Sequence, residues 1–136
     1  RFADLVTAMD TDTKSFQKII ETVFNYWVSP ECDIDGIQSW ADYSGGVVSA
    51  FEGAMASAQS GTDTAIFTSG GTIATIVGHV LRLTSDRVYE FYEPVFNCSI
   101  TRIIFNSRKC SLSTFNDVGH LHLMSAQLRE RLVTYR

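Results

Sequence analysis

The sequence predicts a layered α/β fold, and three observations lead to this class. Apolar residues recur at helical spacing through the first half of the chain. A short apolar run near the middle turns through two glycines into an apolar helix. Two later runs alternate or carry β-branched and aromatic residues, as hairpin strands do. With 136 residues and 45% hydrophobic content, the chain suits a single domain, residues 1–136, with its own core.

The first half is predicted to be helical. Residues 1–9 are compatible with a short helix, and Thr13 is expected to cap a longer one whose apolar residues recur every three or four positions up to Trp27. Pro30 breaks this pattern, and a third helix follows over residues 39–58. We expect the apolar faces of these helices, with their aromatic residues, to form core.

The second half is predicted to mix helix and strand. The expected elements are a buried strand at 64–68, a helix from 70 to 83, a helical turn from 85 to about 94, and a hairpin with strands 98–105 and 110–115 around a turn at 106–109. The C-terminal residues 125–136 suit either a polar helix or an extended tail, and both alternatives stay open.

The turn between the strand and the helix is the expected place of chemistry. It contains Ser69, Gly70 and Gly71 directly before the helix. The first turn of a helix leaves backbone N–H groups without partners at the positive end of the helix dipole, and such groups bind anions such as phosphate. Glycines let a ligand approach the backbone closely. We therefore predict a phosphate-binding turn at these three residues.

Charge and cysteine content exclude several classes of protein. A net charge of −4 argues against nucleic acid as a partner. The sequence contains no run of eighteen apolar residues, so no membrane span is predicted. The sequence shows no signal-peptide pattern. Cys32, Cys98 and Cys110 are odd in number and lack metal-type spacing, which suits a reducing compartment. We expect a cytoplasmic protein without a metal or other cofactor.

Four segments carry a resemblance to a known family. They are residues 64–73 (TAIFTSGGTI), 97–101 (NCSIT), 115–121 (FNDVGHL) and 132–136 (LVTYR). In this order and spacing they resemble the histidine phosphatase superfamily, also called phosphoglycerate mutase-like. The first resembles the strand and turn that carry that family's second active-site histidine, written S-H-G-G. The second and third resemble its N-x-S-I-T and N-x-x-x-H-L elements, and the fourth resembles a common chain ending.

The resemblance implies a three-layer α/β/α fold of which this chain, from about residue 36 onwards, would be the C-terminal half. In the family, a histidine of an Arg-His-Gly motif near the N-terminus is phosphorylated, and an Asp or Glu protonates the leaving group. No Arg-His-Gly occurs in this sequence, and the acid would precede Arg1. The family's Arg-His-Gly strand lies centrally in the sheet, so its absence implies an unpaired strand edge beside residues 64–68. We expect self-association through this edge, or a preceding segment that covers it.

Ser69 stands where the resemblance places the second histidine, so it is the residue of this chain at a catalytic position. A hydroxyl offers a neutral hydrogen bond in place of a charged one, which weakens phosphoryl binding by about 1 to 2 kcal/mol. The first hypothesis is a piece of a phosphomonoesterase or phosphotransferase that acts on phosphorylated small molecules and lacks the nucleophile. The alternative is a non-catalytic phosphate-binding or interaction module.

The polar residues also allow other interpretations. Ser69 can be an ordinary helix cap, and Ser69 with Asp86 or Asp117 and His120 follows the chain order of Ser-Asp-His hydrolases, although Phe67 occupies the place of the first elbow glycine. His120, His122 and Cys110 lack the pattern of a metal site. His79 is expected to be a partly buried packing or capping residue, and Arg102, Arg108 and Lys109 a solvated face that protects the hairpin edge.

Overall fold

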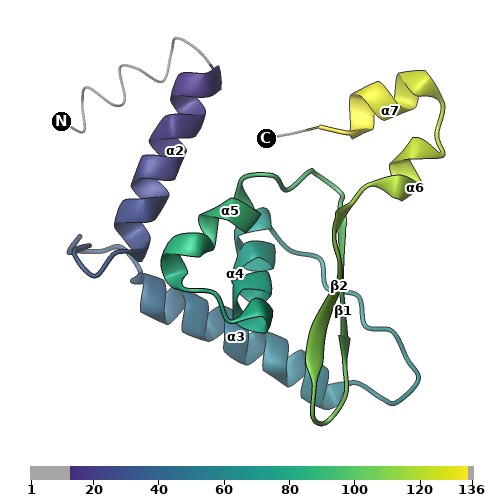
Figure 1. Cartoon of the computed structure of the whole chain (residues 1–136), viewed down its shortest axis with the longest axis horizontal. Coiled ribbons are helices and arrows are strands. Elements are labelled where there is room, and N and C mark those ends of the chain that lie inside the picture. The colour runs from purple at the N-terminus through teal and green to yellow at the C-terminus, as the bar shows by residue number, and fades with distance from the viewer. Residues whose placement is uncertain (1–12, 135–136) are drawn as a thin grey trace. The chain divides into compact units, whose positions relative to one another are not determined.

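The computed structural model describes residues 13–134, so the helix expected over residues 1–9 lies outside the described part of the chain. Contacts divide the chain into two compact units, Arg1–Tyr43 and Ser44–Arg136, and the single domain stays a prediction. The elements, labelled as in Figure 1, are α2 (Thr13–Val28), α3 (Trp40–Ser57), α4 (Gly70–Leu81), η1 (Ser85–Arg87), α5 (Tyr89–Tyr92), β1 (Ile100–Phe105), β2 (Cys110–Asp117), α6 (Gly119–His122) and α7 (Ala126–Leu132). This mixture of helices with a small sheet confirms the α/β class.

The first unit is held by an aromatic cluster at the end of α2. The rings of Phe24, Trp27, Trp40 and Tyr43 lie with centroids 5.1–5.9 Å apart, mostly edge to face. The Trp27 indole N–H donates to the Gln38 carbonyl oxygen at 2.8 Å, so its polar atom is satisfied. Edge-to-face aromatic pairs each add about 0.5–1.5 kcal/mol beyond their buried area. The predicted aromatic cluster is present at this end of the helix, but its four rings are only partly buried.

The rest of the apolar face of α2 is less covered than predicted. Phe16 and Val23 remain 39% and 41% exposed. Within the described chain, the ring contacts of α2 are made by Phe24 and Trp27, and Phe16 takes no part in them.

The helix α3 begins after the N-cap residue Ser39. The Ser39 hydroxyl accepts from the Asp42 backbone N–H at 3.0 Å and donates to the Asp42 carboxylate at 2.8 Å. This exchange satisfies one of the orphan amides at the helix start and fixes where the helix begins. Residue 39 is thus the cap, and the helix proper begins at Trp40.

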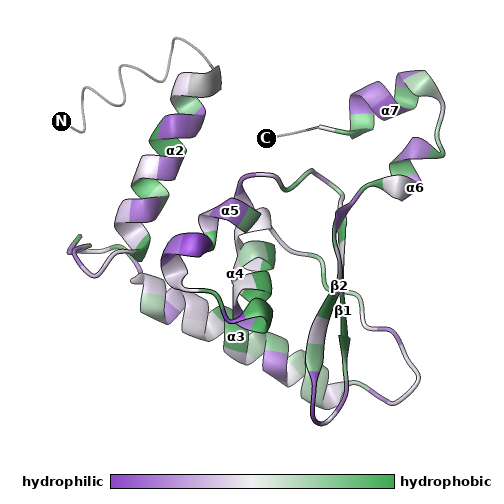
Figure 2. Cartoon of the chain, viewed as in Figure 1, coloured by the Kyte–Doolittle hydropathy of each residue, from purple (hydrophilic) through white to green (hydrophobic). Residues whose placement is uncertain are grey.

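The core of the second unit forms around α4, which Figure 2 shows as largely hydrophobic. The buried apolar residues of this unit are Phe51, Ala74, Ile76, Val77, Val88, Tyr89, Val95 and Leu121. A Cβ atom on Gly78 would lie 3.0 Å from Val88 Cγ2, so this close packing favours glycine. The Thr75 hydroxyl, also buried, donates to the Gly71 carbonyl oxygen at 2.8 Å and is satisfied within the helix.

The helix α4 ends at Leu81, and its C-cap residue Arg82 adopts the left-handed conformation with φ 57° and ψ 43°. The Arg82 N–H bonds back to the carbonyl oxygens of Gly78 and His79, and the Leu83 N–H donates to the Gly78 carbonyl at 2.8 Å. Glycine is the usual residue at such a position because a Cβ atom is disfavoured there. The helix therefore stops two residues before the predicted Leu83.

We expect the substitution Arg82→Gly to raise the free energy of unfolding. Relief of the left-handed strain is worth about 1 kcal/mol, offset in part by the greater freedom of glycine in the unfolded chain, so a net gain of about 0.5 kcal/mol is expected. Urea unfolding of both proteins measures it. Arg82→Ala is the control, because alanine keeps the Cβ atom that is disfavoured in this conformation and removes the rest of the side chain with its charge. A loss of stability in Arg82→Gly greater than in Arg82→Ala would contradict this expectation.

The predicted hairpin is confirmed as β1 and β2, which pair antiparallel. The register is regular from Phe105↔Cys110 to Ile103↔Leu112 and then shifts at two irregularities toward Ile100↔Asp117. Asn106 closes the turn, because its side-chain oxygen accepts from the N–H groups of Arg108 and Lys109. Extra residues in β2 bend the strand near its end, as β-bulges do.

The C-terminal segment is helical, so the helix alternative is confirmed over α7. Ser125 caps this helix by accepting from the Leu128 N–H at 3.4 Å. None of the helices described in the chain combines the length and the apolar character needed to cross a membrane.

The prediction of a strand at residues 64–68 is wrong. The segment is extended but has no ladder partner, and the sheet of the described chain contains β1 and β2 alone. Ile66 and Phe67 are 53% and 96% exposed, against the expectation that this run is buried. Pairing depends on a neighbouring strand, and no described residue supplies one.

Candidate phosphate-binding site

Ser69 lies at the N-cap of α4, with φ −87° and ψ 162°. Its carbonyl oxygen accepts the first helical bond, from the Ile73 N–H at 3.0 Å. Its hydroxyl makes no capping bond to the first turn and instead lies 3.3 Å from the Thr72 hydroxyl. The side chain is exposed and therefore open to a ligand.

The amides that follow Ser69 are equally available. Within the described chain, no hydrogen bond uses the backbone N–H of Gly70 or Gly71. A helix of 12 residues presents these groups at its positive end. Two amides and a hydroxyl at one helix start are a suitable donor set for a phosphate or carboxylate group.

The start of α4 is held in place by the loop before β1. A Cβ atom on Gly70 would lie 3.5 Å from Val95 Cγ1 and 3.9 Å from Tyr92 Cδ2, which is ordinary packing distance. Val95 is itself buried. This contact positions the helix start from one side.

Asn116 fixes that loop in turn. Its side-chain oxygen accepts from the Phe96 N–H at 2.9 Å, and its side-chain N–H donates to the Pro94 carbonyl oxygen at 2.6 Å. Its backbone N–H donates to the Thr101 hydroxyl at 3.2 Å. Asn116 thus ties the end of β2 to both the loop and the start of β1. Through Val95 it supports the turn at Gly70.

The C-terminal segment joins the same arrangement. The Asn97 N–H donates to the Thr134 carbonyl oxygen at 3.1 Å, and the Asn97 side-chain N–H donates to the Thr134 hydroxyl at 2.9 Å. Four segments that are distant in sequence therefore meet at one end of this unit: the Ser69 turn, the 94–99 loop with the start of β1, the end of β2, and the residues after α7.

The backbone of these segments is unusual. Among the described residues, the non-glycine residues with positive φ are Arg82, Cys98 and Asn116, with values of 57°, 59° and 56°. Two of them lie in the meeting segments. Such conformations cost about 1 kcal/mol or more and are common at functional sites.

A comparison with protein families decides the affiliation. The model of the histidine phosphatase superfamily (branch 1) matches residues 8–118, which include the Ser69 turn, the 94–99 loop and both strands of the hairpin. The chain belongs to the histidine phosphatase superfamily. No curated protein and no solved structure matches the chain. The fold is accordingly a partial histidine-phosphatase fold of the α/β class.

The other polar residues singled out in the sequence do not assemble into a second catalytic set. Asp117 accepts from the Gly119 N–H at 2.7 Å, and no bond in the described chain joins it to Ser69 or His120. His120 and His122 are exposed on α6. No group of three His, Cys, Asp or Glu side chains suited to a metal ion occurs among the described residues.

His79 differs from the prediction of a partly buried packing or capping residue. Its side chain is exposed, and Nε2 lies 3.5 Å from Glu52 Oε1. The nearby Cys110 is partly buried, and this burial raises the pKa of its thiol, which therefore stays protonated at neutral pH. Neither residue contacts the Ser69 turn.

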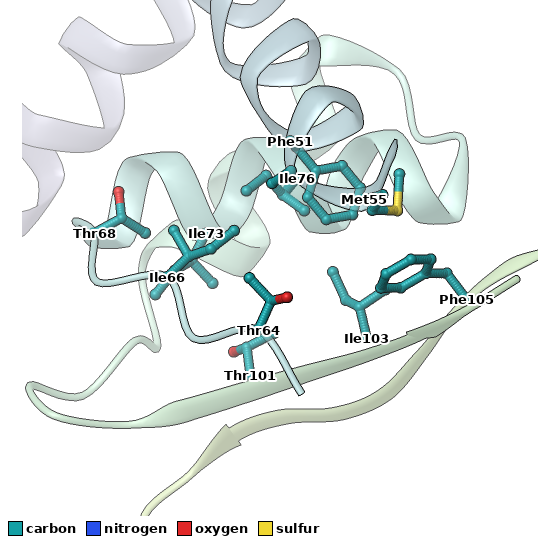
Figure 3. A pocket seen from close by; sticks show the side chains of 11 residues that line it. Phe51, Met55, Thr64, Ile66, Thr68, Ile73, Ile76, Thr101, Ile103 and Phe105 are labelled. Carbon is teal, nitrogen blue, oxygen red and sulfur yellow. The ribbon is translucent and has the colours of Figure 1, made fainter. Parts of the chain in front are cut away.

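An apolar cavity of about 140 Å³ lies between the extended segment 64–68, strand β1 and the helices α3 and α4 (Figure 3). Every second residue of the two extended segments faces it: Thr64, Ile66 and Thr68 on one, Thr101, Ile103 and Phe105 on the other. Phe51 and Met55 line it from α3. The 64–68 segment therefore keeps the period-two pattern of a strand without pairing as one.

Sequence reasoning missed the supporting residues. Asn116 lies in a segment that the resemblance named, but its left-handed backbone and its bonds to residues 94 and 96 have no local sequence signal. The contact of Val95 with the start of α4 also has no sequence signal, because a single valine in a loop does not predict its packing partner.

Proposed function

We propose that the start of α4 binds the phosphate group of a phosphorylated small molecule. The observation that carries this proposal is the exposed Ser69 hydroxyl beside the unused amides of Gly70 and Gly71. In the superfamily resemblance, Ser69 stands at the position of the second active-site histidine. The donors present can hold phosphoryl oxygens without a metal or a cofactor.

The complete activity we propose is that of a phosphomonoesterase or phosphotransferase that works through a phosphohistidine. The 136 residues contain no Arg-His-Gly triplet, so we expect them to bind phosphate without hydrolysing an ester by themselves. The phosphohistidine nucleophile of that activity is therefore not among these residues. The three cysteines are free, which supports a reducing, cytoplasmic location.

The test is the pair of substitutions Ser69→His and Ser69→Ala. A protonated imidazole makes a charged hydrogen bond worth about 1 to 2 kcal/mol more than a neutral one, so we expect Ser69→His to bind phosphate about five- to thirtyfold more tightly than the parent below pH 6.5. The gain should fade as the pH rises and the histidine loses its proton. Isothermal titration with inorganic phosphate measures both effects.

Ser69→Ala serves as the control, since it removes the hydroxyl without adding a charge. It should weaken binding modestly at every pH. An affinity that is the same in all three proteins would place the phosphate elsewhere.

A second candidate function, an interaction module, is favoured by the unpaired segment 64–68. Its backbone makes no hydrogen bond in the described chain, and β1 has one edge without a strand partner there. An edge of this kind is a template for strand addition. We propose that a second copy of this chain supplies the strand.

The substitution Ile66→Pro tests this proposal. Proline removes the residue 66 N–H but suits an extended edge, so the fold should persist while strand addition fails. We expect the dissociation constant of the self-associated form to rise at least about tenfold, which corresponds to about 1.4 kcal/mol. Sedimentation velocity over a range of concentrations measures it. Ile66→Ala controls for the lost side chain, and a parent chain that is monomeric at every concentration would refute the proposal.

A further inference from the structure

A groove with an excess of positive charge lies at the opposite end of α4 from Ser69. Its volume is about 540 Å³, and it is lined by the C-terminal end of α4, by Met55 of α3 and by the turn between β1 and β2. Volumes of this order suit a small-molecule ligand. The helix is 12 residues long, so the groove and the Ser69 turn are separated by about 18 Å.

Three cations face this groove without a carboxylate partner. Arg82 comes from the end of α4, and Arg108 and Lys109 from the hairpin turn. Among the described residues, no ion pair involves any of them. His79 also lines the groove, but Glu52 Oε1 lies 3.5 Å from its Nε2, so this side chain has a carboxylate neighbour. On a chain with a net charge of −4, this is a local reversal of sign.

The backbone on both sides of the groove is fixed. Arg82 is held in the left-handed conformation by two bonds of its N–H, where glycine would fit with less strain. Asn106 holds the N–H groups of Arg108 and Lys109 at 2.8 and 2.9 Å. Between these two sides, Cys110 of β2 contacts Met55 of α3, with 3.9 Å between Sγ and Sδ. The tip of the hairpin is hydrophilic in Figure 2.

A strained position occupied by arginine can serve either helix capping or a ligand. A cation at a helix C-terminus interacts favourably with the helix dipole, which accounts for Arg82 alone. It does not account for Arg108 and Lys109, which belong to the hairpin turn and still line the same groove. A shared anionic ligand accounts for all three.

We propose that this groove binds an oligophosphate group of a small molecule, at a site separate from the Ser69 turn. Three cations match a ligand with several negative charges, and the guanidinium fork pairs with phosphate oxygens in a bidentate manner. The overall negative charge disfavours a long nucleic acid. The ligand is thus a compact oligophosphate, either inorganic or the phosphate chain of a nucleotide.

The experiment titrates the full chain with inorganic tripolyphosphate and, separately, with ATP, by isothermal calorimetry at physiological ionic strength. The test variant carries Arg82→Gly, Arg108→Gln and Lys109→Gln. The matched control carries Arg102→Gln, Arg129→Gln and Arg131→Gln, which remove the same charge elsewhere. Circular dichroism establishes that both variants fold.

We expect saturable binding of tripolyphosphate by the parent and the control, and at least about tenfold weaker binding by the test variant. Each titration is repeated with Gly70→Pro added to the parent, test and control chains, because tripolyphosphate can also bind the amides of the Ser69 turn. The tenfold difference between test and control should persist in this background, so failure of one site is distinguishable from failure of the other. ATP that binds with the same dependence supports the proposal with a nucleotide as the source. No saturable binding of either probe, or an equal loss in the test and control variants, would overturn it.

Discussion

Asn116→Ala is expected to lower the free energy of unfolding by about 3 kcal/mol. The substitution removes the acceptor of the Phe96 N–H and the donor to the Pro94 carbonyl, both partly buried. It also leaves alanine at a φ of 56°, where a Cβ atom is disfavoured. Urea unfolding of the parent and the variant measures the loss.

Asn97→Ala is the matched control. It deletes one exposed side-chain bond, to Thr134, and leaves the backbone bond between the same residues in place. We expect a loss of no more than about 1 kcal/mol, because exposed hydrogen bonds contribute little. An Asn116→Ala cost as small as that of Asn97→Ala would contradict the supporting role of Asn116.

The second large effect concerns Gly70→Pro. Proline suits the first position of a helix, and the residue before it, Ser69, already has the extended conformation that a following proline requires. The added Cβ atom meets Val95 Cγ1 at an acceptable 3.5 Å. The variant should therefore fold while it lacks one of the amide donors. Loss of a hydrogen bond to a charged group costs about 1.5–3 kcal/mol, so phosphate affinity should fall at least about tenfold.

The helices and the hairpin could be predicted from local patterns in the sequence. Helical spacing in α2 and α4 and the alternation in β1 and β2 each act within a few residues, so periodicity predicts them. The Ser69 turn was predicted in the same way, because a glycine pair between an extended run and an apolar helix is a local signal.

The features that could not be predicted depend on contacts between residues far apart in the sequence. The 64–68 segment has the composition of a strand, but strand pairing depends on a neighbour that no described residue supplies. Asn116 contacts residues 20 and 22 positions away, and Asn97 contacts Thr134 across 37 positions. Periodicity does not encode such contacts. The resemblance pointed to these segments, and the structure identified which atoms join them.

The two ends of α4 offer different kinds of hydrogen-bond donor. The Ser69 turn offers amides and a hydroxyl for a single phosphate group, supported by Val95 and Asn116. The opposite end offers side-chain cations for a larger anion. Since their donors differ in kind, substitutions at one end should not alter binding at the other.

The most direct test of the central claim, that the start of α4 binds phosphate, is the phosphate dissociation constant of Gly70→Pro against Gly70→Ala. The two variants share the added Cβ atom and differ in the amide N–H. The account predicts that Gly70→Ala binds inorganic phosphate as the parent does and that Gly70→Pro binds it at least about tenfold more weakly. Equal dissociation constants for two folded variants would contradict it.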